Sequence, residues 1–571
     1  APEGYNLNAS PIPFTVKDNN VTLQVSAKDL IMKSDIELAK VDAETGKPVP
    51  NTSFDLFNSN GDKIGSYKTD ASGLIKIASL KYGKYYFQET TPAEGYLISN
   101  EKYAFTVNSN GAKVVVKASD KPIKGNVVLT KIDAENNSKL DGAVFELYSN
   151  AGTKLGTYTT KEGKIEVDNL RYGSYYFKEI TAPNGYLLKD TTYPFTIKDN
   201  SKTIDLAATN QIKKGTIKII KTDKETGKVI QGALFGLYQG DKKLSECTTD
   251  GSGVAIFNNL RYGTYTVKEL KPATGYVDNS SVITANVTED GKVYSYDVKN
   301  QIIKGKIQIE KLDSDNSSKV EGAQFHVYKA GDLKTPVATL TTDKNGIATT
   351  GDLTFGDYIV QEFNAPNNYY INNKAYPITI AKNGVTVKQL VTNQPVKFRL
   401  KVLKTDIETK QPLAGAQFQI MQNGKPITIK TTVAGKTIEE QTFATNKDGI
   451  IILPSDLRAG KYQLVEVKAP EGYLTAKPVD FSIDRNTKFV EDKIGKIFEI
   501  NIQDQIKKGY VQITKTDVVN GKTLPNTKIT IYANDKKTKL FEGVTDKNGE
   551  VKFGPLKYGH YYYQETGAPE G

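Results

Sequence analysis

The sequence has 571 residues, with 76 Lys and Arg against 65 Asp and Glu, one Cys and two His. This length exceeds that of one domain, a single Cys excludes an intrachain disulfide, and two His cannot supply a His-based metal site in each domain. The net charge of +11 is spread without a Lys/Arg block, and no stretch of 18 apolar residues occurs. We therefore expect no metal, no cofactor, no nucleic-acid partner and no membrane insertion.

The chain repeats itself about every ninety residues. The string YGxYxxxE, or a variant of it, begins at residues 82, 172, 262, 355, 459 and 558, and a Pro-Gly turn such as TPAEGY or APNGY follows. A Lys-X-Asp motif precedes each copy, at Lys40, Lys131, Lys221, Lys311, Lys404 and Lys515. The interval from Lys404 to Lys515 is longer than the other intervals between these lysines because of extra residues around 423–446.

Within each repeat, apolar and polar residues alternate, as in IELAK (36–40) and FDLF (54–57). Turn sequences such as TDASG and TDKNG separate these runs. A period of two predicts β-strands, and no segment shows a sustained helical period. The sequence therefore predicts an all-β tandem array of small antiparallel β-sandwiches. A core of this size without disulfides needs some other reinforcement.

Three polar positions of each repeat share the strand face that points into the core. The first strand carries a lysine on its apolar face, as in Val127, Leu129 and Lys131, and the YGxY strand carries a glutamate in the same way. The last strand of a repeat ends on an inward Asn or Asp. The glutamates are Glu89, Glu179, Glu269, Glu362, Glu466 and Glu565, and the Asn or Asp residues are Asp29, Asp120, Asn210, Asn300, Asn393 and Asp504.

Buried charges are costly unless they are paired or neutralised, so two interpretations of this triad are open. In the first, the Lys and Glu form a buried ion pair that the Asn caps. In the second, burial deprotonates the lysine and protonates the glutamate, which polarises the Asn or Asp carbonyl as the amine attacks it. The product is an amide between the two side chains, with ammonia leaving from Asn or water from Asp. The alternation of Asn and Asp favours the second interpretation.

The Lys-X-Asp strand, the GAxFxLY strand (142–148 and 232–238), the TxDxxG turn and the YGxYxxxExxAPxGY block carry a family resemblance. They resemble the Cna-B type repeats of Gram-positive collagen adhesins and the prealbumin-like domains of sortase-assembled pilins. The resemblance implies immunoglobulin-like, prealbumin-like sandwiches in which the Lys and the Asn or Asp form an isopeptide bond, with the Glu as catalytic group. Departures are Ala459 in place of an aromatic and NTKITIY (526–532) in place of GAxFxLY.

The resemblance also divides the chain. We expect the C-terminal part of a preceding B-type repeat at 1–33, complete repeats at 34–123, 124–213, 214–303, 304–396 and 397–507, and the N-terminal part of a sixth at 508–571. Residues 1–33 supply Asp29 without a Lys or Glu, and residues 508–571 supply Lys515 and Glu565 without an acceptor. We expect flanking sequence to complete both parts. In the alternative, the last part of one chain accepts the first part of another, with Lys515 opposite Asp29.

The sequence thus predicts a structural stalk or fibre segment of a Gram-positive cell-surface protein, stiffened by self-formed isopeptide bonds and projecting an adhesive region. The expected location is extracellular, at the cell surface or wall, and the expected partners are flanking repeats and the wall, through an anchor outside these residues. Two alternatives are open: the repeats bind host extracellular-matrix protein, or the chain is a pilus or fibre subunit that binds copies of itself. We do not expect an enzyme, because bond formation consumes the protein in a single turnover.

Overall fold

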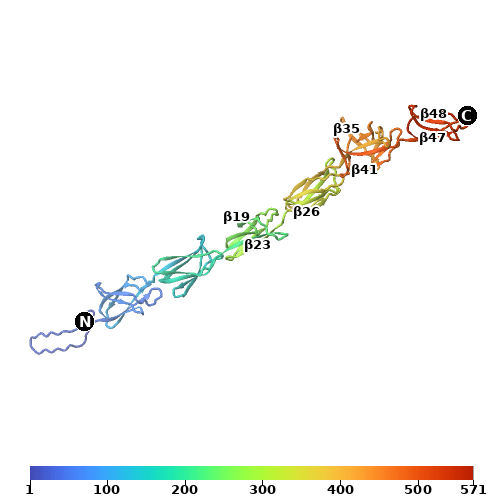
Figure 1. The fold of residues 1–571 in the computed structure, drawn as a ribbon. Helices are drawn as coiled ribbons and strands as arrows, with labels where there is room; N and C mark the ends of the chain where they lie inside the picture. The colour runs from blue at the N-terminus through green and yellow to red at the C-terminus, as the bar shows by residue number, and fades with distance from the viewer. Residues whose placement is uncertain (570–571) are drawn as a thin grey trace. The chain divides into compact units, whose positions relative to one another are not determined.

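The computed structural model describes residues 1–569, which form strands, turns and bends without any helix. No helix of these residues is therefore available to cross a membrane. The chain separates into two compact units, Ala1–Ala273 with Asp278–Lys299, and Thr274–Val277 with Asn300–Gly571. Five complete β-sandwiches and a partial sixth follow one another along the sequence, each in its own stretch of the colour scale (Figure 1). We number them sandwich 1 (33–120), 2 (124–210), 3 (214–300), 4 (304–393), 5 (397–504) and 6 (508–567).

Sandwiches 1 to 3 have the same seven strands in the same order. In sandwich 1 they are β3 (Lys33–Asp42), β4 (Ser53–Asn58), β5 (Lys63–Lys68), β6 (Leu74–Lys81), β7 (Gly83–Thr91), β8 (Lys102–Val107) and β9 (Lys113–Asp120). In sandwich 2 they are β10 (Lys124–Asp133), β11 (Val144–Ser149), β12 (Lys154–Thr159), β13 (Lys164–Arg171), β14 (Gly173–Thr181), β15 (Thr192–Ile197) and β16 (Thr203–Asn210). In sandwich 3 they are β17 (Lys214–Asp223), β18 (Leu234–Gln239), β19 (Lys242–Thr248), β20 (Val254–Arg261), β21 (Gly263–Lys271), β22 (Val282–Val287) and β23 (Val293–Asn300).

Sandwiches 4 and 5 keep this plan but divide some strands into shorter ones. Sandwich 4 has β24 (Lys304–Asp313), β25 (Gln324–Lys329), β26 (Asp332–Thr341), β27 (Ile347–Thr349), β28 (Leu353–Thr354), β29 (Gly356–Asn364), β30 (Ala375–Ile380) and β31 (Thr386–Asn393). Sandwich 5 has β32 (Lys397–Asp406), β33 (Gln417–Gln422), β34 (Lys425–Pro426), β35 (Ile429–Val433), β36 (Lys436–Glu440), β37 (Thr442–Ala444), β38 (Ile450–Ile452), β39 (Leu457–Arg458), β40 (Gly460–Lys468), β41 (Val479–Ile483), β42 (Val490–Asp492) and β43 (Gly495–Asp504).

Sandwich 2 shows the topology that the complete sandwiches share. One sheet has the order β13-β10-β16, and the other has the antiparallel order β12-β11-β14-β15. Strand β10 is antiparallel to β13 but parallel to β16, so that Lys131 lies opposite Ala208 and Asp133 opposite Asn210. The first and last strands of a sandwich are therefore direct neighbours, and this pairing sets the lysine beside the end of the last strand.

The core lies between the two sheets and follows the alternation seen in the sequence. Along β10, every second residue is buried, and Val127 and Leu129 pack against Phe145, Leu147 and Phe177 of the facing sheet. Alternating apolar residues form such strands because only one face of each strand meets the opposite sheet. The prediction of an all-β tandem array of sandwiches is confirmed.

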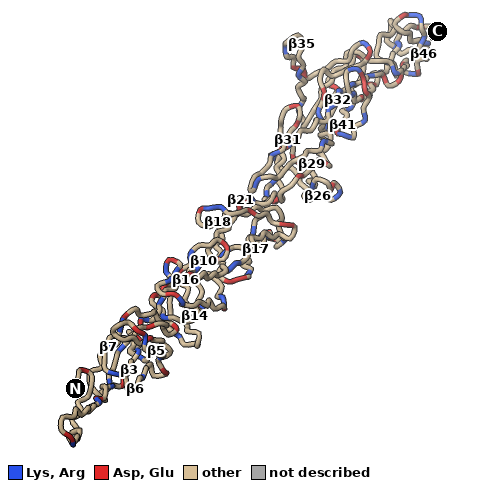
Figure 2. Tube along the Cα trace, turned by 90° about the vertical axis from the view of Figure 1, so that its left-hand side faces the viewer, with Lys and Arg blue, Asp and Glu red and all other residues tan. Residues whose placement is uncertain are grey.

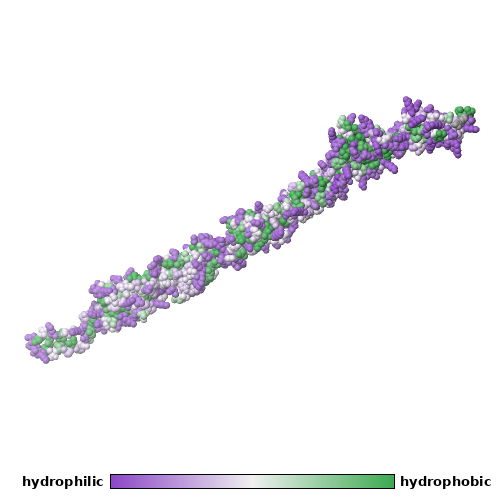
Figure 3. Space-filling model, in the orientation of Figure 1, coloured by the Kyte–Doolittle hydropathy of each residue, from purple (hydrophilic) through white to green (hydrophobic). Residues whose placement is uncertain are grey.

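The outer surface carries both signs of charge, with acidic and basic residues interspersed along the trace (Figure 2). The space-filling view likewise mixes hydrophilic and hydrophobic residues on the face that it shows (Figure 3). The extra residues of sandwich 5 form the two-stranded hairpin β35-β36, which projects from the sandwich (Figure 2). The connection from β41 to β43 adds the further short strand β42.

The two ends of the chain differ from the complete sandwiches. Sandwich 6 has only β44 (Lys508–Thr514), β45 (Lys528–Ala533), β46 (Lys539–Val544), β47 (Glu550–Lys557) and β48 (Tyr561–Gly567). At the other end, β1 (Tyr5–Asn6) pairs with β2 (Leu30–Ile31), and residues 7–29 form no strand. The inward strand expected at Leu23, Val25, Ala27 and Asp29 is therefore not formed, because an isolated strand has no sheet that satisfies its backbone groups.

Candidate functional site

A glycine turn fixes the position of the lysine in each sandwich. In sandwich 3, the backbone N–H of Lys221 donates to the Gly253 carbonyl at 2.7 Å. Gly253 has φ +73°, and a Cβ at this position would lie 2.6 Å from the Lys221 carbonyl oxygen. Only glycine fits this left-handed, crowded position, and this requirement explains the final residue of the TxDxxG turn.

The structure brings the predicted lysine and glutamate together inside each complete sandwich. Both side chains are fully shielded from solvent, with 0% exposure in all five pairs. The distances from Nζ to the nearest carboxylate oxygen are 2.8 Å for Lys40–Glu89, 3.1 Å for Lys131–Glu179, 3.1 Å for Lys221–Glu269, 3.5 Å for Lys311–Glu362 and 3.0 Å for Lys404–Glu466.

The predicted acceptor is the third member of the group. In sandwiches 1, 2, 4 and 5 the lysine amine donates directly to Oδ1 of the acceptor, in the pairs Lys40–Asp120, Lys131–Asn210, Lys311–Asn393 and Lys404–Asp504. In sandwich 3, Asn300 is the buried last residue of β23. Each of these acceptors ends the strand that runs parallel to the lysine strand.

Asn and Asp acceptors meet the glutamate differently. In sandwich 2 the Asn210 amide donates to Oε1 of Glu179 at 2.8 Å, and Asn393 donates to Glu362 in the same way at 2.8 Å. In sandwich 1, neither Oε1 of Glu89 nor Oδ2 of Asp120 has a hydrogen-bond partner among the described residues, although both atoms are buried. Protonation of Glu89, whose pKa burial raises to about 7, would supply the missing donor.

Burial raises the pKa values of some acids of the triads and lowers those of several lysines, and both changes favour amide formation. Burial raises the pKa of Glu89 to about 7, despite the opposing effect of the Lys40 amine, and raises the pKa of Asp504 to about 6. Burial also lowers the pKa values of Lys131, Lys221 and Lys311, the last to about 8, against the attraction of the paired glutamates. In each of these groups burial favours the neutral form, which is the form that an attacking amine or a proton-donating acid must have.

An aromatic ring closes the other side of each amine. The centroid of the Phe145 ring lies 5.3 Å from Nζ of Lys131, and that of Phe54 lies 5.2 Å from Nζ of Lys40. These rings and the apolar core exclude water from the amine. The arrangement therefore has the parts that amide formation needs: an amine, a side-chain carbonyl in contact with it, and an acid that can carry protons between them.

Sandwich 6 holds only part of this group. Nζ of Lys515 lies 3.0 Å from Glu565, but the two side chains are 34% and 36% exposed. Lys515 is only partly shielded because the described residues of sandwich 6 include no counterpart of the last two strands that cover the other lysines. Asp29 is partly exposed and lies outside any strand.

Comparison with known proteins identifies the fold family. The SpaA family, described as a prealbumin-like fold domain, matches residues 34–122, 125–212, 215–302, 305–395, 398–496 and 509–571. The chain belongs to this family. Its six prealbumin-like domains account for nearly all of the sequence, and the predicted resemblance to the Cna-B and prealbumin-like domains of Gram-positive surface proteins is confirmed.

Curated relatives and solved structures share parts of this chain. Serine-aspartate repeat-containing protein F of Staphylococcus epidermidis is 28% identical over 40% of the chain and 16% of its own length. The trypsin-resistant surface T6 protein of Streptococcus pyogenes is 27% identical over 40% of the chain and 38% of its own length. The chain thus spans well under half of either relative. Among solved structures, the Bacillus anthracis TIE protein is 24% identical, with a TM-score of 0.46 over 63% of this chain and 74% of its own.

A second buried acid, which the sequence analysis used only as part of a motif, joins neighbouring prealbumin-like domains. Asp42, the aspartate of the first Lys-X-Asp, accepts hydrogen bonds from the Tyr96 hydroxyl at 2.9 Å and from the Glu44 backbone at 2.9 Å. It also accepts from both terminal nitrogens of Arg171 in the next domain, at 2.7 and 3.2 Å, and Arg171 reaches Glu44 at 2.9 Å. A bidentate guanidinium pair of this kind fixes the angle between two groups as well as their distance.

The same contact recurs at two other junctions. Arg261 pairs with Asp133 and Glu135, and Arg458 pairs with Asp313 and Asp315. Two features of the sequence could have indicated this contact. An arginine precedes the YG motif, or its AG variant, in these domains, and every Lys-X-Asp motif ends in aspartate. Sequence reasoning missed the contact because the partners lie in different repeats, more than one hundred residues apart.

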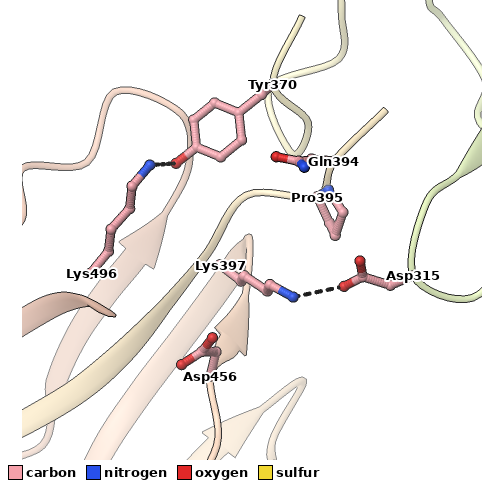
Figure 4. A pocket seen from close by; sticks show the side chains of 7 residues that line it. All are labelled: Asp315, Tyr370, Gln394, Pro395, Lys397, Asp456 and Lys496. Atoms are coloured by element: carbon pink, nitrogen blue, oxygen red, sulfur yellow. Dashed lines mark hydrogen bonds and ion pairs between the residues drawn. The ribbon is translucent and has the colours of Figure 1, made fainter. Parts of the chain in front are cut away.

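The junction between sandwiches 4 and 5 also has a polar hollow at its surface (Figure 4). Lys397 extends across it to Asp315 at 2.9 Å, and Lys496 donates to the Tyr370 hydroxyl at 3.2 Å. Gln394 and Pro395 line the hollow where the chain passes from one sandwich to the other. Lys397 and Lys496 thus bind residues of the neighbouring sandwich, and these contacts add to that of Arg458 at the same junction.

Replacing Arg171 by Ala should weaken the first junction in a pH-dependent way. The Arg171 guanidinium holds the pKa of Asp42 well below its usual range. A depressed carboxyl pKa stabilises the folded state above the unfolded value of about 4, and this contribution is lost as pH falls through the folded value. We expect the variant to lose about 1 to 3 kcal/mol at pH 7 and progressively less below pH about 4. Calorimetric unfolding of the full chain across pH measures this difference.

The matched control is Arg399→Ala, because Arg399 pairs with the partly exposed Asp456 inside a single sandwich. A control loss as large as that of Arg171→Ala, or a loss that persists unchanged at pH 2, would contradict the assignment of this effect to Asp42.

Proposed function

We propose that this chain is a structural segment of a Gram-positive cell-surface stalk or pilus-like fibre, and that each complete sandwich closes an isopeptide bond between its lysine and its Asn or Asp. The observation that carries the proposal is the fully buried Lys-Glu pair with an Asn or Asp carbonyl in contact with the amine, repeated in sandwiches 1, 2, 4 and 5. The acceptor is Asn in some sandwiches and Asp in others. Amide formation can use either residue, whereas a buried Lys-Glu ion pair gives no reason for this alternation.

The reaction needs no outside reagent. In the structure the Asn210 amide nitrogen donates to Glu179, so the amide must first turn over to bring its carbonyl oxygen to that acid. The neutral Lys131 amine then attacks Cγ of Asn210, while protonated Glu179 hydrogen-bonds the carbonyl oxygen and stabilises the negative charge that develops there. Glu179 accepts a proton from the attacking nitrogen and delivers one to the leaving amide nitrogen. The new C–N bond replaces the old one, and ammonia leaves. With Asp120 or Asp504 as acceptor, a C–O bond breaks and water leaves.

The proposed role of the glutamates is supported by the loop that follows the YGxY strand, which contacts two of them. Oε2 of Glu362 accepts the backbone N–H of Asn372 at 2.7 Å, and Oε2 of Glu466 accepts that of Ala476 at 2.6 Å. One carboxyl oxygen is therefore fixed by the backbone, and the other faces the amine or the acceptor. The predicted catalytic set is Glu89, Glu179, Glu269, Glu362 and Glu466, with Glu565 in the partial sandwich.

Two relatives support a location outside the cell. Serine-aspartate repeat-containing protein F and the trypsin-resistant surface T6 protein each match 40% of this chain. We place the chain outside the cell, with repeats at 34–123, 124–213, 214–303, 304–396 and 397–507 acting as spacers between an anchor and an adhesive region. We do not propose that the chain acts repeatedly on another molecule, because each bond forms once, within the protein itself.

A second candidate function, binding of host matrix protein, is favoured by one feature. The β35-β36 hairpin has no counterpart in the other sandwiches and exposes Val433 and Ile438. Projecting apolar side chains of this kind are typical of contact surfaces.

Intact mass under denaturing conditions tests the proposed function. Asn210, Asn300 and Asn393 should each release ammonia, and Asp120 and Asp504 should each release water. The purified chain should therefore be lighter than its sequence by three ammonia and two water molecules. A mass equal to that of the sequence would show that the triads are unreacted ion pairs.

A further inference from the structure

A loop joins the YGxY strand to the following strand in each complete sandwich, and we call it the YGxY loop. Its first half is held by a tyrosine: the Tyr96 hydroxyl donates to Asp42 at 2.9 Å, and the Tyr369 hydroxyl donates to Asp313 at 3.0 Å. Its second half carries the residue ten positions after the glutamate of the triad. In sandwiches 1 to 5 the loop spans 92–101, 182–191, 272–281, 365–374 and 469–478.

The second half of the YGxY loop contacts the glutamate in some sandwiches and not in others. The backbone N–H of Asn372 donates to Glu362 at 2.7 Å, and sandwich 5 has the same contact. In sandwiches 1 and 2, by contrast, Oε1 of Glu89 and Oε2 of Glu179 are buried without a hydrogen-bond partner among the described residues. The same loop therefore has two positions, one closed on the carboxyl group and one away from it.

The side chain of Asn372 stabilises the closed position in sandwich 4. Its amide donates to the Tyr376 hydroxyl at 3.0 Å and to the Thr392 carbonyl at 2.9 Å, and Thr392 directly precedes the acceptor Asn393. In sandwich 2, Tyr193 has the register position of Tyr376, but its buried hydroxyl has no hydrogen-bond partner among the described residues. The tyrosine therefore binds the loop in sandwich 4 and not in sandwich 2.

A surface hollow of sandwich 1 connects the YGxY loop with the acceptor. It is lined by residues 97–99 of the loop and by Ser119 and Asp120 at the end of β9. Asp120 is only 1% exposed, and its Oδ2 has no hydrogen-bond partner among the described residues. The hollow thus ends at the acceptor, and the loop forms one of its walls. A small polar molecule formed at the acceptor can leave by this route when the loop is away from the glutamate.

Departure of the leaving molecule decides whether the new bond is permanent. Ammonia that stays beside the new amide is itself a nucleophile. Its attack on the amide carbon forms a C–N bond, breaks the bond to the lysine nitrogen, and restores both the Asn and the free amine. This reversal ends when the ammonia escapes into solvent and takes up a proton. With an Asp acceptor the reverse reaction uses water, so exclusion of solvent afterwards has the same effect.

We propose that the YGxY loop is a gate that controls the passage of ammonia and water between the amide-forming site and solvent. This inference rests on the proposed function. When the loop contacts the glutamate, the leaving molecule stays beside the new amide and the reaction can reverse. When the loop is away, the molecule departs and the bond remains. The two side-chain bonds of Asn372 favour the closed position, so they slow the completion of the bond in sandwich 4.

The rate of bond formation in the newly synthesised full chain tests the gate. Cell-free synthesis is stopped after a short pulse, full-length chain is denatured at intervals and digested, and mass spectrometry reports the loss of ammonia from sandwich 4. Asn372→Ala keeps the backbone N–H on the glutamate, as Ala476 does in sandwich 5, but removes both side-chain bonds. It should make the loss from sandwich 4 about five- to tenfold faster, the factor that one net hydrogen bond provides.

A faster reaction distinguishes a gate from a residue that only supports the fold, because loss of such support would slow the reaction. Tyr376→Phe removes one of the two bonds and keeps the ring, so it should accelerate sandwich 4 less than Asn372→Ala does. The control Asn373→Ala, at the exposed neighbouring position, should leave the rate unchanged. Hydrogen exchange within 365–374 should also be faster in Asn372→Ala than in this control.

Three results would contradict the inference in different ways. Slower or unchanged loss of ammonia from sandwich 4 in Asn372→Ala and Tyr376→Phe, with all five mass losses complete at the end, overturns the gate and leaves the proposed function standing. Equal acceleration by the control Asn373→Ala also overturns the gate. Absence of mass loss from every sandwich contradicts the proposed function, and the gate with it.

Discussion

Pulling one molecule from its two ends should extend each complete sandwich by almost nothing. Force enters sandwich 2 along β10 and meets the Lys131 side chain, which the proposed bond joins to Asn210 at the end of β16. The segment between these two residues, which are 79 positions apart, then carries no tension. Without the bond, the same segment would release about 270 Å when fully extended. Within sandwiches 1 to 5, only the connectors from each acceptor to the next lysine should yield.

Single-molecule force spectroscopy measures this extension. The unsubstituted chain should show no unfolding steps from sandwiches 1 to 5, and Lys131→Ala should add one step of roughly 270 Å. Lys139→Ala, at a lysine outside the core of the same sandwich, is the control and should add no step. Full-length steps from all five sandwiches in the unsubstituted chain would refute the cross-links.

Replacing Glu179 should remove one bond and destabilise one sandwich. The acid that polarises the Asn210 carbonyl has no reach into another sandwich, so Glu179→Ala should reduce the mass deficit by one ammonia and leave the other bonds intact. Closing a loop of this length stabilises the fold by about 4 to 5 kcal/mol on the entropy relation used for disulfides. Loss of the bond also leaves the Lys131 amine buried without its acid, which adds a cost of about 3 to 5 kcal/mol.

Intact mass and limited proteolysis measure the two effects. Protease should cut Glu179→Ala first within 124–210. Glu179→Gln keeps the shape of the side chain but not its acidity, so its mass deficit should also be smaller by one ammonia. The control Glu166→Gln lies on the exposed face of β13 and should keep the full deficit. A full deficit in both Glu179 variants would remove this residue from its assigned role.

The sequence alone determined the β-sandwich array and the members of the triad. Alternation along a strand is a local property, so the inward parity of Lys131, Glu179 and Asn210 was readable from neighbouring residues. Repetition made the pattern reliable, because the same parity returned in each repeat. Burial then follows from parity, and the raised pKa of Glu89 follows from burial.

Tertiary structure alone decided which groups meet. The parallel pairing of β10 with β16 sets the Lys131 amine on Asn210, and no local pattern specifies that register. The contact of Arg171 with Asp42 joins different repeats, so it depends on how two folded surfaces meet. The same reason explains the partial exposure of Lys515. Its strand parity is inward, but a strand face becomes a core only when other strands cover it, and the described residues of sandwich 6 include no counterpart of the two strands that end each complete sandwich.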